Sequence, residues 1–291
     1  RLFDLPRSSW DDYDKSLISQ GGGVWSRSVK HVPLSPEVRA RLGISAEQLT
    51  PSELINAILK APVDLLYNGG IGTYFKASSQ SQQDANDRGN DAIRADANEI
   101  RARVVVEGGN LGLTQKARIE YALGGGLIYT DAIDNSAGVG TSDHEVNIKI
   151  LISSLIGNGD MTFKQRDALL VAITDEVGCQ VLVENYQQTA AVSLEACAGK
   201  EMLGAHTQVI RHLEAKGGLN RAIEFLPDDK GLAERAQMGC GLTAPEISVL
   251  LAYTKIALKQ ALLASSLPDA AEFQPLLVDY FPPAVQSQCR E

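Results

Sequence analysis

The sequence predicts an α/β fold class, in which an incomplete parallel sheet precedes an all-α C-terminal region. Two observations lead to this prediction. Between Arg103 and Glu145, apolar runs alternate with glycine-bearing turns and helical segments, which is the pattern of a parallel sheet with helical crossovers. After Glu145, apolar residues recur at helical spacing and no further run is typical of a strand. We therefore expect a sheet domain over residues 1–145 and a helical domain over residues 146–291.

The first half of the central stretch predicts a strand, a ligand-accessible turn and a helix. Val104 to Val106 is a β-branched run, typical of a buried parallel strand. It is followed by the turn Glu107–Asn110, where Gly108 and Gly109 allow the backbone to approach a ligand. The segment from Thr114 to Leu123 is expected to be helical and to end at the glycines that follow.

The second half of the stretch predicts the same order of elements again. Leu127 to Ile133 is expected to be the next strand, and Asp134 to Gly140 a loop of small residues. Ser142 and Glu145 have the spacing of a capping box, which would open a new helix. In open α/β sheets, ligands bind at the carboxyl ends of the strands, so both loops are candidate binding elements.

The residues before this stretch extend the predicted sheet. Helices are expected to start at Ser35 and Thr50, each of which precedes a proline. A strand over residues 63–67 then ends in Asn68, Gly69 and Gly70, another glycine loop. Three further expectations are a short helix over 8–18, a strand, extended segment or plain loop over 24–30, and a helix over 91–101.

The C-terminal half predicts helices that differ in length. The expected helices cover residues 146–156, 162–198 as one long or kinked helix, 202–215, 219–226 and 247–263, and a last one starts near Pro282. The helix over 247–263 is preceded by Thr243 and Glu246, which have the spacing of a capping box.

Composition excludes several classes of partner and site. The net charge of −9 and the pI of about 5.1 argue against nucleic acid or an anionic membrane as a partner. The longest apolar runs are too short to span a bilayer, and no signal peptide is visible at the N-terminus. The cysteines have no metal-ligand spacing, so we expect free thiols in a reducing cytoplasm and no metal site. These cysteines are Cys179, Cys197, Cys240 and Cys289.

Several stretches of the sequence resemble the glutamate dehydrogenases. EGGN at Glu107–Asn110 and DNSAGVGTSDHE at Asp134–Glu145 are similar to two loops of that family. The segment from VDLLYNGGIGTY through SDHEVNIKILI closely resembles the large NAD-specific glutamate dehydrogenases of bacteria, as does FDLPRSSWDDYDKSLISQGGGVWSRS. The resemblance covers roughly residues 1–260 and implies the latter half of a Rossmann-like dinucleotide-binding domain, followed by C-terminal helices.

The resemblance also implies an activity and its cofactor. The family oxidises L-glutamate to 2-oxoglutarate and ammonia with hydride transfer to NAD. The family's glycine fingerprint, its first strands and its catalytic Lys and Asp have no match in this sequence. We therefore assign no catalytic residue to the chain and expect the isolated chain to be inactive. A homo-oligomer is also expected. Two alternatives remain open: a non-catalytic helical assembly module, and a dehydrogenase for a related amino acid.

The resemblance assigns binding roles to two glycine loops on the cofactor side. Asn110 matches the residue that approaches the nicotinamide-ribose, and Gly108 and Gly109 leave room for the ring. Asn68, with Gly69 and Gly70, matches a loop that passes along the cofactor. From the residues alone, both asparagines are equally consistent with turns that end a strand.

On the substrate side, Asn135 matches a residue beside the substrate and the nicotinamide. Ser142 matches a serine that binds the side-chain carboxylate of the substrate. A predicted helix N-terminus at Ser142 would favour an anion, although the residues alone favour the interpretation that this serine only caps its helix. His144 is not assigned a catalytic role, because a histidine in a first helical turn is more often structural. Spacing alone cannot decide whether Lys76, Arg94 and Lys116 contact phosphate or substrate.

Overall fold

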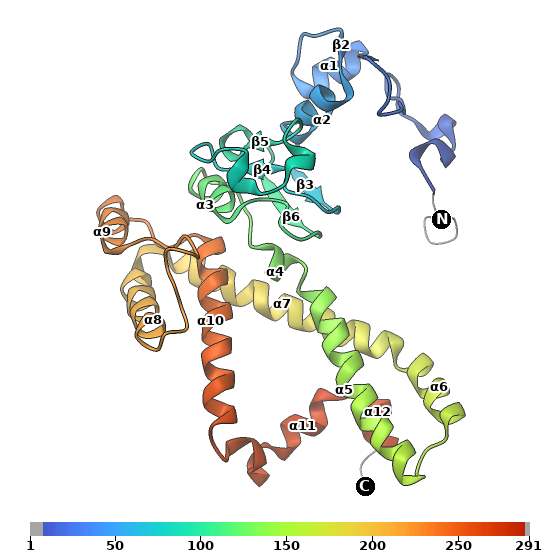
Figure 1. Ribbon diagram of the computed structural model, residues 1–291, viewed down its shortest axis with the longest axis vertical. Coiled ribbons are helices and arrows are strands. Elements are labelled where there is room, and N and C mark those ends of the chain that lie inside the picture. The colour runs from blue at the N-terminus through green and yellow to red at the C-terminus, as the bar shows by residue number, and fades with distance from the viewer. Residues whose placement is uncertain (1–7, 289–291) are drawn as a thin grey trace. The chain divides into compact units, whose positions relative to one another are not determined.

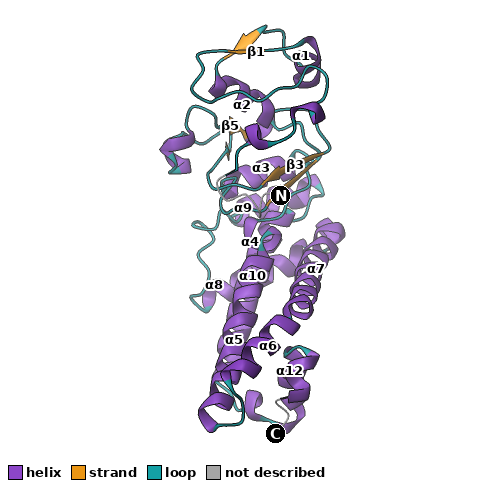
Figure 2. Cartoon of the chain, turned by 90° about the vertical axis from the view of Figure 1, so that its right-hand side faces the viewer, coloured by secondary structure: helices purple, strands orange, loops and turns teal. Residues whose placement is uncertain are grey.

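The computed structural model describes residues 8–288. The chain divides into two compact units, Arg1–Ile128 and Tyr129–Glu291. Within the described residues, the strands lie in the first unit and the second unit is helical, as Figure 2 shows. The predicted fold class, α/β with a helical C-terminal region, is confirmed. The domain boundary at residue 145 stays a prediction, because a division by internal contacts does not test a boundary between functional domains.

The first unit contains six short strands and three helices among its described residues, besides 3-10 turns (Figure 1). The strands are β1 (Val32–Pro33), β2 (Gln48–Leu49), β3 (Leu65–Asn68), β4 (Phe75–Lys76), β5 (Ala95–Asp96) and β6 (Val104–Glu107). The helices are α1 (Pro36–Leu42), α2 (Pro51–Leu59) and α3 (Gln115–Leu123). Each begins where it was predicted to begin, and the side chains of Ser35, Thr50 and Thr114 each accept a backbone N–H of the first turn.

Two of the strand pairs in this unit are parallel. Strand β3 pairs with β6 from Leu65 opposite Val104 to Asn68 opposite Glu107, and β4 pairs with β5. Leu127 adds a single parallel bridge to Val104, on the β6 side. The buried side chains of Phe75, Val105 and Leu113 form the centre of the unit's core.

The second unit contains nine helices among its described residues. They are α4 (Asp131–Asp134), α5 (Ser136–Asn158), α6 (Phe163–Ala172), α7 (Thr174–Ala198), α8 (Leu203–Ala215), α9 (Asp229–Met238), α10 (Ala244–Leu263), α11 (Gln274–Tyr280) and α12 (Pro283–Gln288). Glycines in the left-handed conformation end α5 and α9, at Gly159 and Gly239. Among the described residues, no helix has the length and apolarity that a membrane crossing requires.

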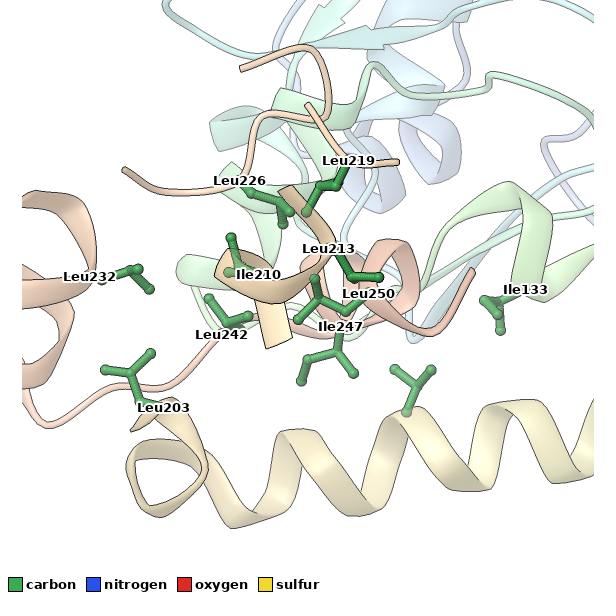
Figure 3. Close-up of a cluster of buried hydrophobic side chains, with 11 residues drawn as sticks. Ile133, Leu203, Ile210, Leu213, Leu219, Leu226, Leu232, Leu242, Ile247 and Leu250 are labelled. Atoms are coloured by element: carbon green, nitrogen blue, oxygen red, sulfur yellow. The ribbon is translucent and has the colours of Figure 1, made fainter. Parts of the chain in front are cut away.

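The helical unit has two hydrophobic cores. In the first, side chains of α8 and α10 such as Ile210 and Ile247 gather against α7, as Figure 3 shows. In the second, Ile148 and Ile152 of α5 pack with residues of α6 and with Val285 of α12. Figure 1 shows α5 crossing α7, and these two helices are in contact. Helix α7 therefore contacts the elements of both cores.

The strand predicted over 127–133 and the loop predicted over 134–140 are wrong. Only Leu127 pairs with a strand, residues 131–134 form α4, and α5 already begins at Ser136. The small residues here lie within α5 and form no turn. Gly140 faces α7, because a Cβ added there would lie at an ordinary contact distance, 3.4 Å, from a carboxylate oxygen of Glu184. The predicted capping box of Ser142 and Glu145 is also wrong, because both residues lie inside α5.

Three other local predictions fail for a shared reason. Residues 91–101 form β5 and a 3-10 turn instead of a helix, and residues 219–226 form turns. Residues 8–18 form two 3-10 turns, each with a side-chain cap, in place of one helix. These are short polar or mixed segments, in which tertiary contacts outweigh weak helical periodicity. The segment 24–30 contains no strand.

Candidate functional site

The two predicted cofactor loops of the first unit leave neighbouring parallel strands at the same end. Asn68 is the last residue of β3 and lies opposite Glu107, the last residue of β6. Beyond them, the backbone N–H groups of Gly108 and Gly109 both donate to the carbonyl of Asn68, at 2.8 and 3.0 Å. The loops at Asn68–Gly70 and Glu107–Asn110 are therefore joined side by side, which is the arrangement predicted for a binding edge.

The glycines at this edge are required by space. A Cβ added at Gly109 would overlap the carbonyl oxygen of Gly70, and one at Gly108 would overlap the hydroxyl of Tyr67. A Cβ at Gly112 would overlap the side-chain amide nitrogen of Asn68. Overlap with backbone cannot be relieved by a rotamer change, so Gly109 is the most constrained of the three.

A buried ion pair lies beneath the second loop. Glu107 is 0 % exposed and its carboxylate accepts two hydrogen bonds from the guanidinium of Arg118 on α3, at 2.6 and 2.9 Å. The same carboxylate accepts the backbone N–H of Leu113 at 3.0 Å. This bidentate pair joins the start of the loop to its end and to α3, so it fixes the loop between them.

Polar and strained groups are concentrated at the surface of the two loops. The Nδ2 atom of Asn68 is buried and has no hydrogen-bond partner among the described residues. Asn110 is exposed, and Leu111 beside it has a φ of 55° with its side chain 60 % exposed. A leucine in the left-handed region is unusual, and such strain occurs most often at functional positions.

The far end of the first loop is fixed by Asp87. Its carboxylate accepts the side-chain N–H of Asn90 at 2.6 Å and the backbone N–H of Thr73 at 2.8 Å. These two hydrogen bonds lower the pKa of Asp87 below its ordinary value, the one from Asn90 having the larger effect. Arg94 is buried and donates to the carbonyl of Thr73 at 2.8 Å and to Asp91 at 2.6 Å.

The three cations considered for phosphate or substrate all lie in the first unit. Arg94 donates to the loop described above, and Lys76 forms an ion pair with Asp96. Lys116 is exposed on α3. Arg94 therefore stabilises the loop and has its donors in use there.

The two predicted substrate residues lie in the helical unit. Asn135 is the residue between α4 and α5, and Ser142 is exposed in α5, about two turns further on. The hydroxyl of Ser142 donates to the carbonyl of Val139 at 2.9 Å. Asn185 of α7 fixes the junction, because its amide donates to the carbonyl of Ile133 at 2.9 Å and to the hydroxyl of Ser136 at 2.8 Å.

The geometry brings the six residues of the cofactor loops together: Asn68, Gly69, Gly70, Gly108, Gly109 and Asn110. It places Asn135 and Ser142 on one helical segment of the other unit. A cavity of about 730 Å³ in the first unit lies at the amino ends of the same strands, lined by Asp64, Arg103 and Gly124 among others. The loops at the carboxyl ends remain the better candidate, since ligands of parallel sheets bind there.

Sequence reasoning missed Glu107 and Arg118 as functional supports, although the pattern contained a signal. In a strand, alternate residues share a face, so Glu107 lies on the same side as Val105. Both are buried. A carboxylate at a buried position requires a cationic partner, and Arg118 on the following helix was a candidate.

Residues 8–288, which the structure describes, contain three of the four cysteines. Within that range, no group of three or more His, Cys, Asp or Glu side chains could hold a metal ion. Cys179, Cys197 and Cys240 are free and exposed. Cys289 lies outside the described residues.

Comparison with known proteins connects these loops to a family. Residues 1–195 match the model of the bacterial NAD-glutamate dehydrogenase catalytic domain, and residues 239–291 match that of the glutamate dehydrogenase C-terminal region. The chain is 56 % identical over 269 residues to the NAD-specific glutamate dehydrogenase of Pseudomonas aeruginosa, covering 92 % of the chain and 17 % of that protein.

Two further relatives carry the same name. The protein of Mycobacterium tuberculosis is 51 % identical over 99 % of the chain, and that of Halomonas elongata is 47 % identical over 100 % of it. The chain spans 18 % of the length of each. The catalytic-domain model matches two thirds of the chain. The sequence identities to the relatives are near one half along nearly all of the chain. This chain belongs to the bacterial NAD-glutamate dehydrogenase family.

Proposed function

We propose that the chain is part of a longer NAD-dependent glutamate dehydrogenase, called the parent protein below. The parent protein oxidises L-glutamate to 2-oxoglutarate and ammonia, with hydride transfer to NAD. The observation that carries the proposal is the pair of glycine loops that leave β3 and β6 side by side. A homo-oligomeric state and a cytoplasmic location stay predictions.

The residues of the two loops fit the nicotinamide end of a dinucleotide. NAD supplies the hydride acceptor when it is bound, and the chain binds and orients it. Gly108 and Gly109 have no side chains, and the exposed carboxamide of Asn110 can both donate and accept hydrogen bonds. Because the N–H groups of both glycines already donate to Asn68, they are not available to a pyrophosphate. The loops therefore suit the nicotinamide end of the cofactor better than its anionic pyrophosphate.

Asn135 and Ser142 are proposed to bind the substrate, with Asn135 also beside the nicotinamide. Asn135 lies at the junction of α4 and α5, and Ser142 lies within α5, so one short segment of the chain carries both. Ser142 is exposed, and its hydroxyl can turn from the carbonyl of Val139 to donate to a carboxylate. Since α5 begins at Ser136, an anion at Ser142 would gain this hydrogen bond but not the unpaired N–H groups of the helix start.

No residue of the chain is assigned the general acid or base, so the isolated chain is proposed to be inactive. The test is titration of NADH into the chain and into the parent protein, with glutamate turnover measured on both. Near-zero turnover by the chain and turnover by the parent protein are expected. Turnover by the chain alone would contradict the assignment of the acid and base to other segments. Absence of turnover by the parent protein would favour the assembly module.

The contribution of the loop is tested in the parent protein with Asn110→Ala. Loss of one hydrogen bond to a neutral group costs about 1 kcal/mol, so NAD binding should weaken roughly five- to tenfold. Asn98→Ala is the matched control, since Asn98 is exposed and lines the cavity at the other end of the strands. Equal affinities of the two variants for NADH would refute the role of Asn110.

A further inference from the structure

A histidine interrupts the apolar face that α5 presents to α7. Residues 140, 144, 148 and 152 are spaced by four and therefore lie on one face of the helix. The last two are isoleucines, whereas His144 is 2 % exposed and carries a polar ring. Its Nε2 atom lies 2.9 Å from a carboxylate oxygen of Glu184 on α7. Ser142, two residues earlier, lies on the opposite side of the helix and is exposed.

The C-terminal segment contacts the same histidine. The ring of Tyr280, the last residue of α11, stacks on the ring of His144 with the centroids 4.7 Å apart and the planes at 11°. The Tyr280 hydroxyl accepts a hydrogen bond from Asn147 of α5 at 2.8 Å. The carbonyl of Tyr280 accepts one from Gln180 of α7 at 3.4 Å. Tyr280 therefore contacts both α5 and α7 where the histidine lies.

These contacts fix how α5 is rotated on α7. An apolar side chain could pack there in several orientations, but a hydrogen-bonded and stacked ring accepts few. Glu184 and its neighbour Asn185 act on the same segment, since Asn185 donates to Ile133 of α4 and to Ser136 at the start of α5. The start of α5 is thus fixed at Ser136 and, about two turns later, at His144. Ser142 lies between these two points.

We propose that His144, Glu184 and Tyr280 are positioning residues, which set the direction in which Ser142 faces the carboxylate of the substrate. This inference rests on the proposed function of Ser142. A rotation of the helix by a fraction of one residue would move the hydroxyl by an ångström or more, and misplacement of about 1 Å can cost up to 100-fold in activity. The C-terminal segment thereby takes part in substrate binding without contacting the substrate.

The chain offers a matched control, which is a second buried histidine that contacts a glutamate of α7. His206 of α8 is 6 % exposed, and its Nε2 atom lies 3.0 Å from a carboxylate oxygen of Glu195. Glu195 and Glu184 have equally exposed side chains, and the Nδ1 atoms of both histidines lack a hydrogen-bond partner among the described residues. His206 belongs to the core of α8 and α10 and does not support α5.

The experiment compares His144→Gln, Tyr280→Leu, His206→Gln and Ser142→Ala in the parent protein. The measurements are KM for glutamate, KM for NAD, kcat, the melting temperature and the dissociation constant of 2-oxoglutarate by calorimetry. His144→Gln and Tyr280→Leu should raise KM for glutamate and weaken 2-oxoglutarate binding by roughly tenfold, with KM for NAD within about twofold. His206→Gln should lower the melting temperature similarly and leave KM for glutamate within about twofold.

The outcomes separate this inference from the function on which it rests. If Ser142→Ala raises KM for glutamate and His144→Gln does so no more than His206→Gln, the inference is overturned and the function stands. If Ser142→Ala has no effect, the proposed role of Ser142 fails and the inference fails with it. Should His144→Gln not fold, Glu184→Ala replaces it, since the side chain of Glu184 is 44 % exposed and the variant removes the partner of the His144 Nε2 atom. It must then show the same selective rise in KM for glutamate.

Discussion

Each unit contains a buried glutamate that binds an arginine through two hydrogen bonds. In the first unit Glu107 accepts from Arg118, and in the second Glu246 accepts from Arg235 at 2.6 and 2.7 Å. Both glutamates are 0 % exposed. They differ in what else the carboxylate binds. Glu107 accepts the N–H of Leu113 at the end of a glycine loop, whereas Glu246 accepts the N–H and hydroxyl of Thr243 at the start of α10.

The comparison shows how the same ion pair serves two purposes. At α10 the pair supports a helix whose later turns are already fixed by their own hydrogen bonds and by packing. At the glycine loop there is no such ladder, so the pair supplies the rigidity that the loop lacks. We therefore expect changes around Glu107 to affect ligand binding, and changes around Glu246 to affect stability alone.

The largest effect is expected from Glu107→Ala and Glu246→Ala. Each leaves a buried arginine without its partner, which costs about 3–5 kcal/mol of unfolding free energy. Urea unfolding should show losses of similar size, while NADH titration of the parent protein should detect weakened binding only in Glu107→Ala. A Glu246 variant that binds NADH as weakly as the Glu107 variant would break the comparison.

The next largest change in unfolding free energy is expected from substitution of one glycine in each unit. Gly109→Ala places a methyl group against the carbonyl of Gly70, and overpacking of this kind costs about 1–3 kcal/mol. Gly178 lies inside α7, and a Cβ there would meet no atom within 4 Å, so Gly178→Ala should stabilise by about 0.5–1 kcal/mol. Denaturant midpoints of both variants test this. If Gly109→Ala destabilises and Gly178→Ala stabilises, the loop requires its glycine and the helix does not.

A smaller effect distinguishes a helix cap from a helix interior within the second unit. Thr243 caps α10, and Thr243→Ala should cost about 1 kcal/mol of unfolding free energy. Ser142 lies inside α5 and has no capping bond, so Ser142→Ala should change stability by less than about 0.5 kcal/mol. Thermal melts measure both. A loss from Ser142→Ala as large as that from Thr243→Ala would show that the serine does act as a cap.

The smallest effect is the acid sensitivity of one carboxylate in each unit. Hydrogen bonds from Asn90 and Thr73 lower the pKa of Asp87, and Arg221 lowers the pKa of Glu214. A lowered folded-state pKa gives stability that is present above the unfolded-state pKa and lost as the pH falls through the folded-state pKa. Asp87→Asn and Glu214→Gln should therefore differ most from the unaltered chain above about pH 4.5 and least near pH 2.

Salt separates these two carboxylates. Raising the ionic strength to about 1 M screens the ion pair of Glu214 with Arg221. The two neutral donors of Asp87 are little affected, and its longer ion pair, with the buried Arg94 at 3.9 Å, is screened less than an exposed one. Melting temperatures measured from pH 6 to pH 2.5 at low and high salt test both statements. A destabilising effect of Asp87→Asn that grows as the pH falls would have the wrong sign for a lowered pKa.

Much of the architecture follows from local signals. The starts of α1, α2 and α10 were predictable, because a capping side chain and a first-turn proline or acid act within four residues. The start of α3 depends on the capping side chain of Thr114 alone. The loops after β3 and β6 were predictable for a similar reason, since glycines follow short apolar runs. Helix α9 was not predicted, although Asp228 caps it, because its apolar face is weak.

The sequence by itself determined where these strands end, where most helices begin and which family's motifs the loops resemble, because such signals depend on neighbours along the chain. Only the tertiary structure decided that α5 starts at Ser136, that Ser142 lies inside this helix, and that Glu107 and His144 are buried beside Arg118 and Glu184. Those outcomes depend on partners far along the chain or on another helix, and the energy of a buried polar contact is set by both partners together.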